Sequence, residues 1–139
     1  MKTIIAILSF YLSLIFTGNA TDFSYGSGQA SIMPKASQSL INAMHKIDDR
    51  IYAVGAHAII IYSDDLGESW TQSELVPYTN TLTDIHCVSV QECWATGHEA
   101  TIIHSNDGGK TWVKQYEDVD YDAPLLSIHM FDNKEGVAI

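Results

Sequence analysis

One eight-residue signature occurs twice in this chain, at residues 63–70 and 105–112, 42 positions apart. Both copies read Ser-x-Asp-x-Gly-x-(Ser/Thr)-Trp. Five fixed positions coincide by chance on the order of once per million windows, so two copies in phase indicate a duplicated structural unit. The fixed positions are Ser63, Asp65, Gly67, Ser69 and Trp70 in the first copy and Ser105, Asp107, Gly109, Thr111 and Trp112 in the second.

The repetition extends beyond the signature. The stretch 52–55, Tyr-Ala-Val-Gly, matches 94–97, Trp-Ala-Thr-Gly, and the Ile-rich run 59–63 matches 101–105, at the same offset. Short β-rich runs bounded by Gly, Asn and Asp, without a helical period, indicate an all-β fold. A unit of four strands that recurs every 40 to 45 residues is typical of a propeller blade. In the second unit, the expected strands are 83–90, 93–97, 100–105 and 111–116.

A third copy of the unit begins and stops early. Residues 127–130 parallel 84–87, and residues 136–139 parallel 93–96, at an offset of 43. The sequence therefore predicts an incomplete β-propeller with two full four-stranded blades and part of a third. Because propellers close with roughly four to eight blades, we expect the chain to be a piece of a longer protein, truncated at its C-terminus.

The chain divides into three expected segments: a signal peptide at 1–20, a flexible leader at 21–39, and propeller blades at 40–139. The leader is rich in Gly, Ser, Ala and Gln and lacks periodicity, which is typical of a flexible segment. Residues 37–45 are the best helix candidate in the chain. Their place one repeat before 79–87 favours a strand instead.

The first twenty residues have the pattern of a cleaved secretory signal. Lys2 precedes an almost wholly apolar run at 4–16, and Ala20 closes a stretch of small residues. This run is shorter than the roughly 20 residues that span a bilayer, which disfavours a membrane anchor. We therefore expect export to the periplasm or the extracellular space, or to the thylakoid lumen in a photosynthetic source. No membrane span is expected after cleavage.

The exported chain is strongly acidic. The whole sequence has 7 Lys and Arg against 17 Asp and Glu, and cleavage would also remove Lys2. An acidic surface repels nucleic acid and anionic lipid headgroups, so proteins or neutral ligands are the expected partners. The alternative is that the charge serves only to keep an exported protein soluble.

Cys87 and Cys93 are the two cysteines of the chain. Export permits a disulfide between them, and the five residues that separate them read as the turn between two strands. In the chain-entropy model, so small a ring stabilises the fold by about 2 kcal/mol. A single Cys-x5-Cys pair cannot complete a zinc site, so a structural role is expected.

The signature has a structural explanation as a hairpin turn between the third and fourth strands of a blade. Asp65 and Asp107 would accept hydrogen bonds from backbone N–H groups of their own turns, while the glycines supply positive φ. Trp70 and Trp112 would then insert into the layer between sheets, each burying on the order of 200 Å².

The signature resembles the Asp-box, or bacterial-neuraminidase repeat. The fuller stretch 94–112 resembles the photosystem II assembly and stability factor family of propellers, and this similarity extends over about residues 40–139. The resemblance implies an assembly factor that binds subunits of a membrane complex. Two features depart from the family: Ala58 and Ala100 replace its second glycine, and Arg50 is the single arginine, whereas photosynthetic members carry an Arg-rich surface.

Enzymatic readings find little support in the sequence. Sialidases share the Asp-box, but their active site needs three arginines to hold a carboxylate, and this chain has Arg50 alone. His86 and His129 recur at matched positions in successive units, but they show no ligand spacing typical of a metal site. The stretch 107–111 lacks the first glycine and the following helix of a phosphate-binding loop. We therefore expect no cofactor, no metal and no catalytic residue.

Together these features predict a non-catalytic, exported propeller scaffold for protein association, with photosystem-type complex assembly as the role implied by resemblance. Its expected partners are proteins, with subunits of a membrane complex among the candidates, and not nucleic acid. The alternative is a secreted glycan-binding protein or a fragment of a sialidase-like glycoside hydrolase.

Overall fold

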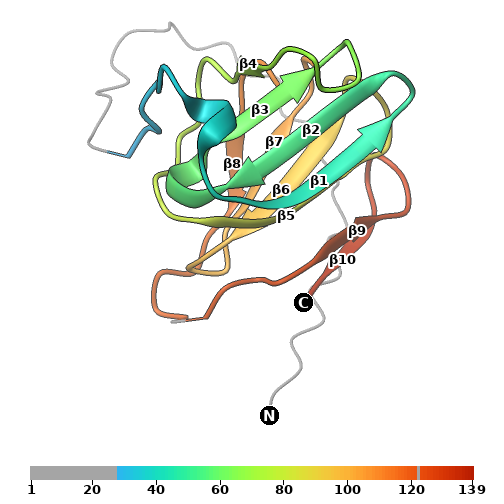
Figure 1. Cartoon of the computed structure of the whole chain (residues 1–139). Helices are drawn as coiled ribbons and strands as arrows, with labels where there is room; N and C mark the ends of the chain where they lie inside the picture. Colours follow the sequence, from blue (N-terminus) through green and yellow to red (C-terminus); the bar gives the residue numbers. More distant parts are fainter. Residues whose placement is uncertain (1–27, 122) are drawn as a thin grey trace, which may run out of the picture.

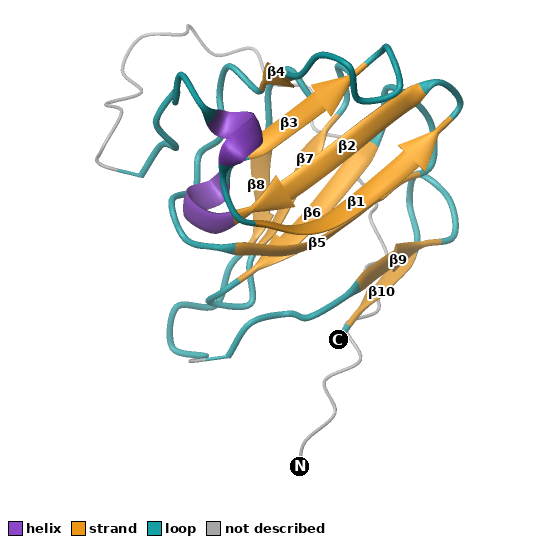
Figure 2. Ribbon diagram, in the orientation of Figure 1, coloured by secondary structure: helices purple, strands orange, loops and turns teal. Residues whose placement is uncertain are grey.

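Short antiparallel strands joined by tight turns account for most of the chain. The computed structural model describes residues 28–121 and 123–139. The predicted signal peptide at 1–20 and the first part of the predicted leader, 21–27, lie outside the described residues. Within the described ranges the chain forms strands and two single 3-10 turns but no α-helix (Figure 2). No helix there has the length and apolarity to cross a membrane.

The strands form three antiparallel sheets, in each of which neighbours in sequence are neighbours in space. Sheet 1 contains β1 (Ile41–Ile47), β2 (Arg50–Gly55), β3 (Ile60–Ser63) and β4 (Thr71–Gln72). Sheet 2 contains β5 (Leu82–Cys87), β6 (Cys93–Gly97), β7 (Ile102–Ser105) and β8 (Val113–Tyr116). Sheet 3 contains β9 (Ile128–Met130) and β10 (Gly136–Ala138). The 3-10 turns are η1 (Ala36–Gln38) and η2 (Ala56–Ala58).

This arrangement confirms the predicted all-β fold, with two four-stranded blades and part of a third. The segment 37–45, which the repeat assigned to a strand, enters β1 at Ile41 after the turn η1. The first strands of the three sheets, β1, β5 and β9, lie next to one another in that order (Figure 1).

The sheets stack face to face, and we call the face that points to the following sheet the forward face and the opposite one the rear face. Between sheets 1 and 2 the core joins forward-face residues such as Tyr52 and Ile60 to rear-face residues such as Ile103 and Trp112. Between sheets 2 and 3, Trp94 packs in the same way with Ile128, Met130 and Ala138. Alternation along each strand therefore gives both faces an apolar surface to bury.

In the described part of the predicted flexible leader, residues 28–39, Ala36 packs against the rear face of sheet 1 and Ala30 joins the core between sheets 1 and 2. Ala36 is buried with Ala53, Ile59 and Ile61. The backbone N–H of Ala30 donates to the carbonyl of Val76 at 2.9 Å. Hydrophobic burial explains this docking, because the rear face of sheet 1 is apolar and would otherwise be exposed to water.

The turn between the second and third strands of each four-stranded sheet contains two residues with left-handed backbone conformation. His57 and Ala58 have φ of 57° and 54°, and Glu99 and Ala100 have φ of 56° and 46°. Ala58 and Ala100 therefore hold, at some conformational cost, the backbone that a glycine would adopt freely. This geometry explains why a glycine suits these two positions in the family that the sequence resembles.

Candidate functional site

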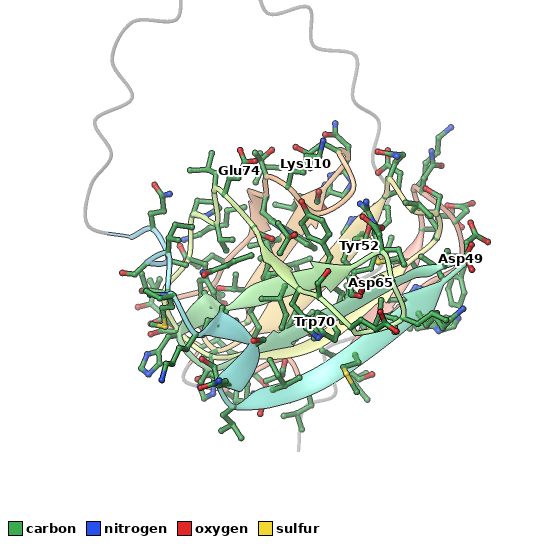
Figure 3. The ribbon with its side chains drawn as sticks, turned by 45° about the horizontal axis from the view of Figure 1, so that its top comes forward. Asp49, Tyr52, Asp65, Trp70, Glu74 and Lys110 are labelled. Carbon is green, nitrogen blue, oxygen red and sulfur yellow. A yellow bond between two sulfur atoms is a disulfide. The ribbon has the colours of Figure 1, made fainter. Side chains whose placement is uncertain are left out.

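The first copy of the signature forms a closed turn between β3 and β4. The Asp65 carboxylate accepts the hydroxyl of Ser63 at 2.7 Å and the backbone N–H of Ser69 at 2.8 Å. The Ser63 hydroxyl oxygen in turn accepts the N–H of Gly67 at 2.8 Å. The indole N–H of Trp70 donates to the carbonyl of Gly67 at 3.1 Å, which fixes the tryptophan to its own turn (Figure 3).

The second copy repeats this geometry between β7 and β8. The Asp107 carboxylate accepts the hydroxyls of Ser105 at 2.8 Å and Thr111 at 2.6 Å, together with the N–H of Thr111. The Trp112 indole donates to the carbonyl of Gly109 at 3.2 Å. The two turns thus use the same hydrogen bonds at matched positions.

Hydrogen bonding accounts for the acidity of both carboxyl groups. Donation from Ser69, chiefly by its hydroxyl and then its backbone N–H, lowers the pKa of Asp65 to about 2. Burial opposes ionisation of Asp107, but donation from Thr111, Ser105 and Lys110 together lowers its pKa. Because these carboxylates are engaged by their own turns, they act as structural anchors. Among the described residues, no group of three or more His, Cys, Asp or Glu side chains is placed to hold a metal ion.

The two tryptophans differ in cover, contrary to the expectation that both lie between sheets. Trp112 is 1% exposed in the core between sheets 1 and 2, where its indole also donates to the hydroxyl of Ser73 at 3.1 Å. Trp70 is only half-buried, against the rear-face cluster of sheet 1. The reason is that the short segment containing Ala36, rather than a full sheet, covers this face in the described part of the chain.

Cys87 and Cys93 form a disulfide with Cα atoms 4.0 Å apart. They pair directly across the β5–β6 hairpin, and both are buried in the core between sheets 1 and 2. The bond therefore closes a hairpin whose strands also belong to the main core.

Arg50 ties sheet 1 to sheet 2, a role that the sequence did not indicate. Its guanidinium makes a bidentate pair with Asp64 at 2.5 and 2.7 Å and donates to the carbonyl of Gly108 at 2.8 Å. It also lies over the Tyr62 ring, 4.7 Å from the centroid. Nearby, the Tyr52 hydroxyl donates to the carbonyl of Val90 at 2.5 Å. The single arginine is therefore engaged in a cross-sheet contact.

Sheet 2 carries a different set of side chains at the matching positions. Glu92 stands in place of Arg50, and its carboxylate lies 2.5 Å from Nε2 of His104. His104 stacks on Trp94 with ring centroids 4.5 Å apart. The forward faces of the two sheets thus share a framework and differ in charge.

A row of three histidines crosses the first strand of each sheet, β1, β5 and β9. His45 pairs with Tyr52, His86 with Trp94 and His129 with Val137, so each occupies the same register position in its hairpin. The ring centroids of His45 and His86 are 4.7 Å apart, and those of His86 and His129 are 4.6 Å apart.

The sequence pattern revealed only His86 and His129. His45 escaped detection because the first hairpin is one residue shorter between the histidine and its partner on the second strand, which breaks the common offset. Aligning the hairpins by their strand pairing, instead of by a fixed offset, would have found it.

Burial is the main influence on His45 and His86, because it lowers the pKa of both. The carbonyl of Cys87 and the charge of Asp84 oppose the shift at His45. At His86 the neighbouring histidines lower the pKa further, while Asp84 raises it. The row is therefore neutral at pH 7 at these two positions.

Comparison with known proteins supports the fold. No protein-family model matches the sequence, and no curated protein matches it. Among solved structures, YCF48 bound to D1 peptide matches with a TM-score of 0.61 and 24% sequence identity. The match covers 71% of this chain and 34% of that one, so this chain spans about a third of the length of the solved protein. A likeness at this identity establishes the propeller fold alone.

Proposed function

We propose that this chain is part of an exported, non-catalytic propeller that binds a segment of another protein and resembles photosystem II assembly and stability factors. The observation that carries the proposal is the shared fold with YCF48, whose solved structure contains a bound D1 peptide. In this proposal the two signature turns are Asp-box turns, which build the blades and take no part in chemistry. Subunits of a membrane complex are the proposed partners.

The engagement of the charged side chains supports a scaffold over a hydrolase. Arg50 is committed to Asp64 and to the carbonyl of Gly108, so it is not available to bind a substrate carboxylate. Asp65 and Asp107 accept hydrogen bonds from their own turns. No observation specifically favours glycan binding or cleavage.

Export is supported by the apolar N-terminal sequence and by the disulfide between Cys87 and Cys93, because disulfides persist in oxidising compartments. Secretion of the full chain from a bacterial host, followed by N-terminal sequencing, tests this part. We expect a secreted protein that starts at Thr21. A protein that keeps residues 1–20, or that stays inside the cell, would contradict this expectation.

The D1 peptide is the probe for the proposed function. A fluorescent D1 peptide is titrated with the oxidised full chain, and a scrambled peptide of identical composition serves as the control. We expect saturable binding that is at least about tenfold tighter for D1 than for the scrambled peptide, a difference of about 1.4 kcal/mol. Equal binding of the two peptides would overturn the photosystem-type role. Turnover of a fluorogenic sialoside above the enzyme-free rate would overturn the non-catalytic assignment.

A further inference from the structure

Sheet 3 is attached to sheet 2 by a small set of polar contacts beside the histidine row. Nδ1 of His86 accepts the backbone N–H of Met130 at 3.2 Å. The Asp84 carboxylate accepts the Ser127 hydroxyl at 2.8 Å and the N–H of Ile128 at 2.9 Å. The Thr83 hydroxyl also donates to the carbonyl of Leu125.

Beneath these contacts lies the apolar layer between the two sheets. Trp94 and Ile102 of sheet 2 are 4% and 3% exposed, and they pack against Ile128, Met130 and Ala138 of sheet 3. Among the described residues, sheet 3 shares fewer contacts with sheet 2 than sheet 1 does. Opening between sheets 2 and 3 therefore breaks fewer contacts than opening between sheets 1 and 2.

We propose that His86, flanked by the rings of His45 and His129, is a pH-sensitive latch that holds sheet 3 closed when neutral and releases it on acidification. Release exposes the forward face of sheet 2, with Trp94 and Ile102. This regulation goes beyond the proposed function and is measured without any partner, so its failure and that of the proposed function are distinguishable.

The closed geometry requires His86 to be unprotonated at Nδ1. Protonation turns this nitrogen into a donor that faces the N–H of Met130, so the hydrogen bond across the sheets is lost. The rings of His45 and His129, whose centroids lie less than 5 Å from that of His86, further lower the pKa of His86 and so disfavour its protonation in the closed state. Asp84 is the carboxylate that acts on both His45 and His86, and it already holds Ser127 and Ile128.

The direction of the pH effect follows from the lowered pKa of His86 in the closed state, since His86 is the member of the row that bonds directly to sheet 3. Above the ordinary histidine value of 6.5, His86 is neutral in both the closed and the open state, and the closed state keeps its full stability. Below 6.5, His86 in the open state binds a proton that the closed state excludes. The closed-to-open ratio then falls up to about tenfold per pH unit until the closed-state pKa of His86 is reached.

Amide hydrogen exchange measured by mass spectrometry between pH 8 and pH 5 tests the latch on the oxidised full chain. After correction for the intrinsic pH dependence of exchange, we expect residues 125–139 to lose protection below pH 6.5, while residues 93–105 keep theirs. His86→Asn places an amide oxygen close to the position of Nδ1 and does not titrate. This variant should lose protection at a pH about one unit lower than the wild type, or should keep its protection throughout.

His98→Asn is the matched control, because His98 is exposed and lies in a turn outside the row. It should leave the profile unchanged. His129→Asn, at an exposed position, provides a second variant that removes a neighbouring imidazole from His86 without altering the hydrogen bond to Met130, and it should give a smaller shift in the same direction. Protection of 125–139 that is independent of pH, or identical profiles for the wild type and both row variants, would overturn the latch.

Discussion

Replacing Trp112 and Trp70 by phenylalanine, one at a time, compares two equivalent tryptophans that differ in burial. The Trp112 indole donates to Gly109 and to Ser73 in a buried site. The single indole N–H is shared between these two acceptors, so its loss costs about 1 kcal/mol, and the smaller ring leaves unfilled core volume worth about another 1 kcal/mol. We therefore expect Trp112→Phe to reduce the free energy of unfolding by about 2 kcal/mol.

Trp70→Phe removes a single hydrogen bond, to Gly67, from a half-buried ring that water can reach. Water replaces the lost donor there, so the expected loss is about 1 kcal/mol or less. The measurement is urea unfolding of the oxidised chain, followed by far-ultraviolet circular dichroism with a shared m-value. An equal loss for the two variants, or a larger one for Trp70→Phe, would refute the assignment of Trp112 to the interior layer and Trp70 to a partly covered face.

Three further predictions concern the turns and the disulfide. Gly109→Ala combines a φ of +80° with a Cβ placed 2.7 Å from Tyr52, so it should destabilise the fold by about 2–4 kcal/mol. Gly67→Ala, at φ +94° but with 3.6 Å to the nearest atom, should cost only about 1–2 kcal/mol in the same urea unfolding assay. Because the pKa of Asp65 is about 2 in the fold against 3.8 ordinarily, its contribution is complete above pH 3.8 and is lost as the pH falls toward 2. On acid titration, the free energy of unfolding of Asp65→Asn should therefore decline less steeply than that of the wild type. Parallel curves for the two proteins would contradict this reasoning. Reduction of the bond between Cys87 and Cys93 should lower the free energy of unfolding by about 2 kcal/mol, measured by urea unfolding with and without reductant.

The sequence predicted those parts of the fold that are repeated at a fixed spacing. The common offset placed β6 and β7 within a residue or two, because strand pairing and the turn between β7 and β8 depend on residue types that both copies retain. It also assigned β1 to a strand against a local helical pattern. Duplication is a strong signal because each copy corroborates the other.

Features that depend on neighbouring sheets were not visible in the repeat. Trp70 and Trp112 are equivalent in sequence, but their burial depends on what packs outside each sheet. The contact of Arg50 with Gly108 was missed because its counterpart in the second unit is Glu92, so the two copies offered no common pattern there. The docking of residues 28–39 needs only a few small apolar side chains, Ala30 and Ala36 among them, and such a requirement leaves little trace in composition.

The unlike forward faces of sheets 1 and 2 have a consequence for folding. Tandem copies of one unit are prone to misassembly, in which a unit docks on the wrong neighbour or on the same unit of another molecule. On sheet 1, the guanidinium of Arg50 lies over Tyr62 and donates to the Gly108 carbonyl of sheet 2. At the matching positions, sheet 2 has the carboxylate of Glu92 and the imidazole of His104. A chain that skipped a sheet during assembly would leave Arg50 without its carbonyl acceptor. Side chains that vary between the copies thus make the contacts at the two sheet interfaces different.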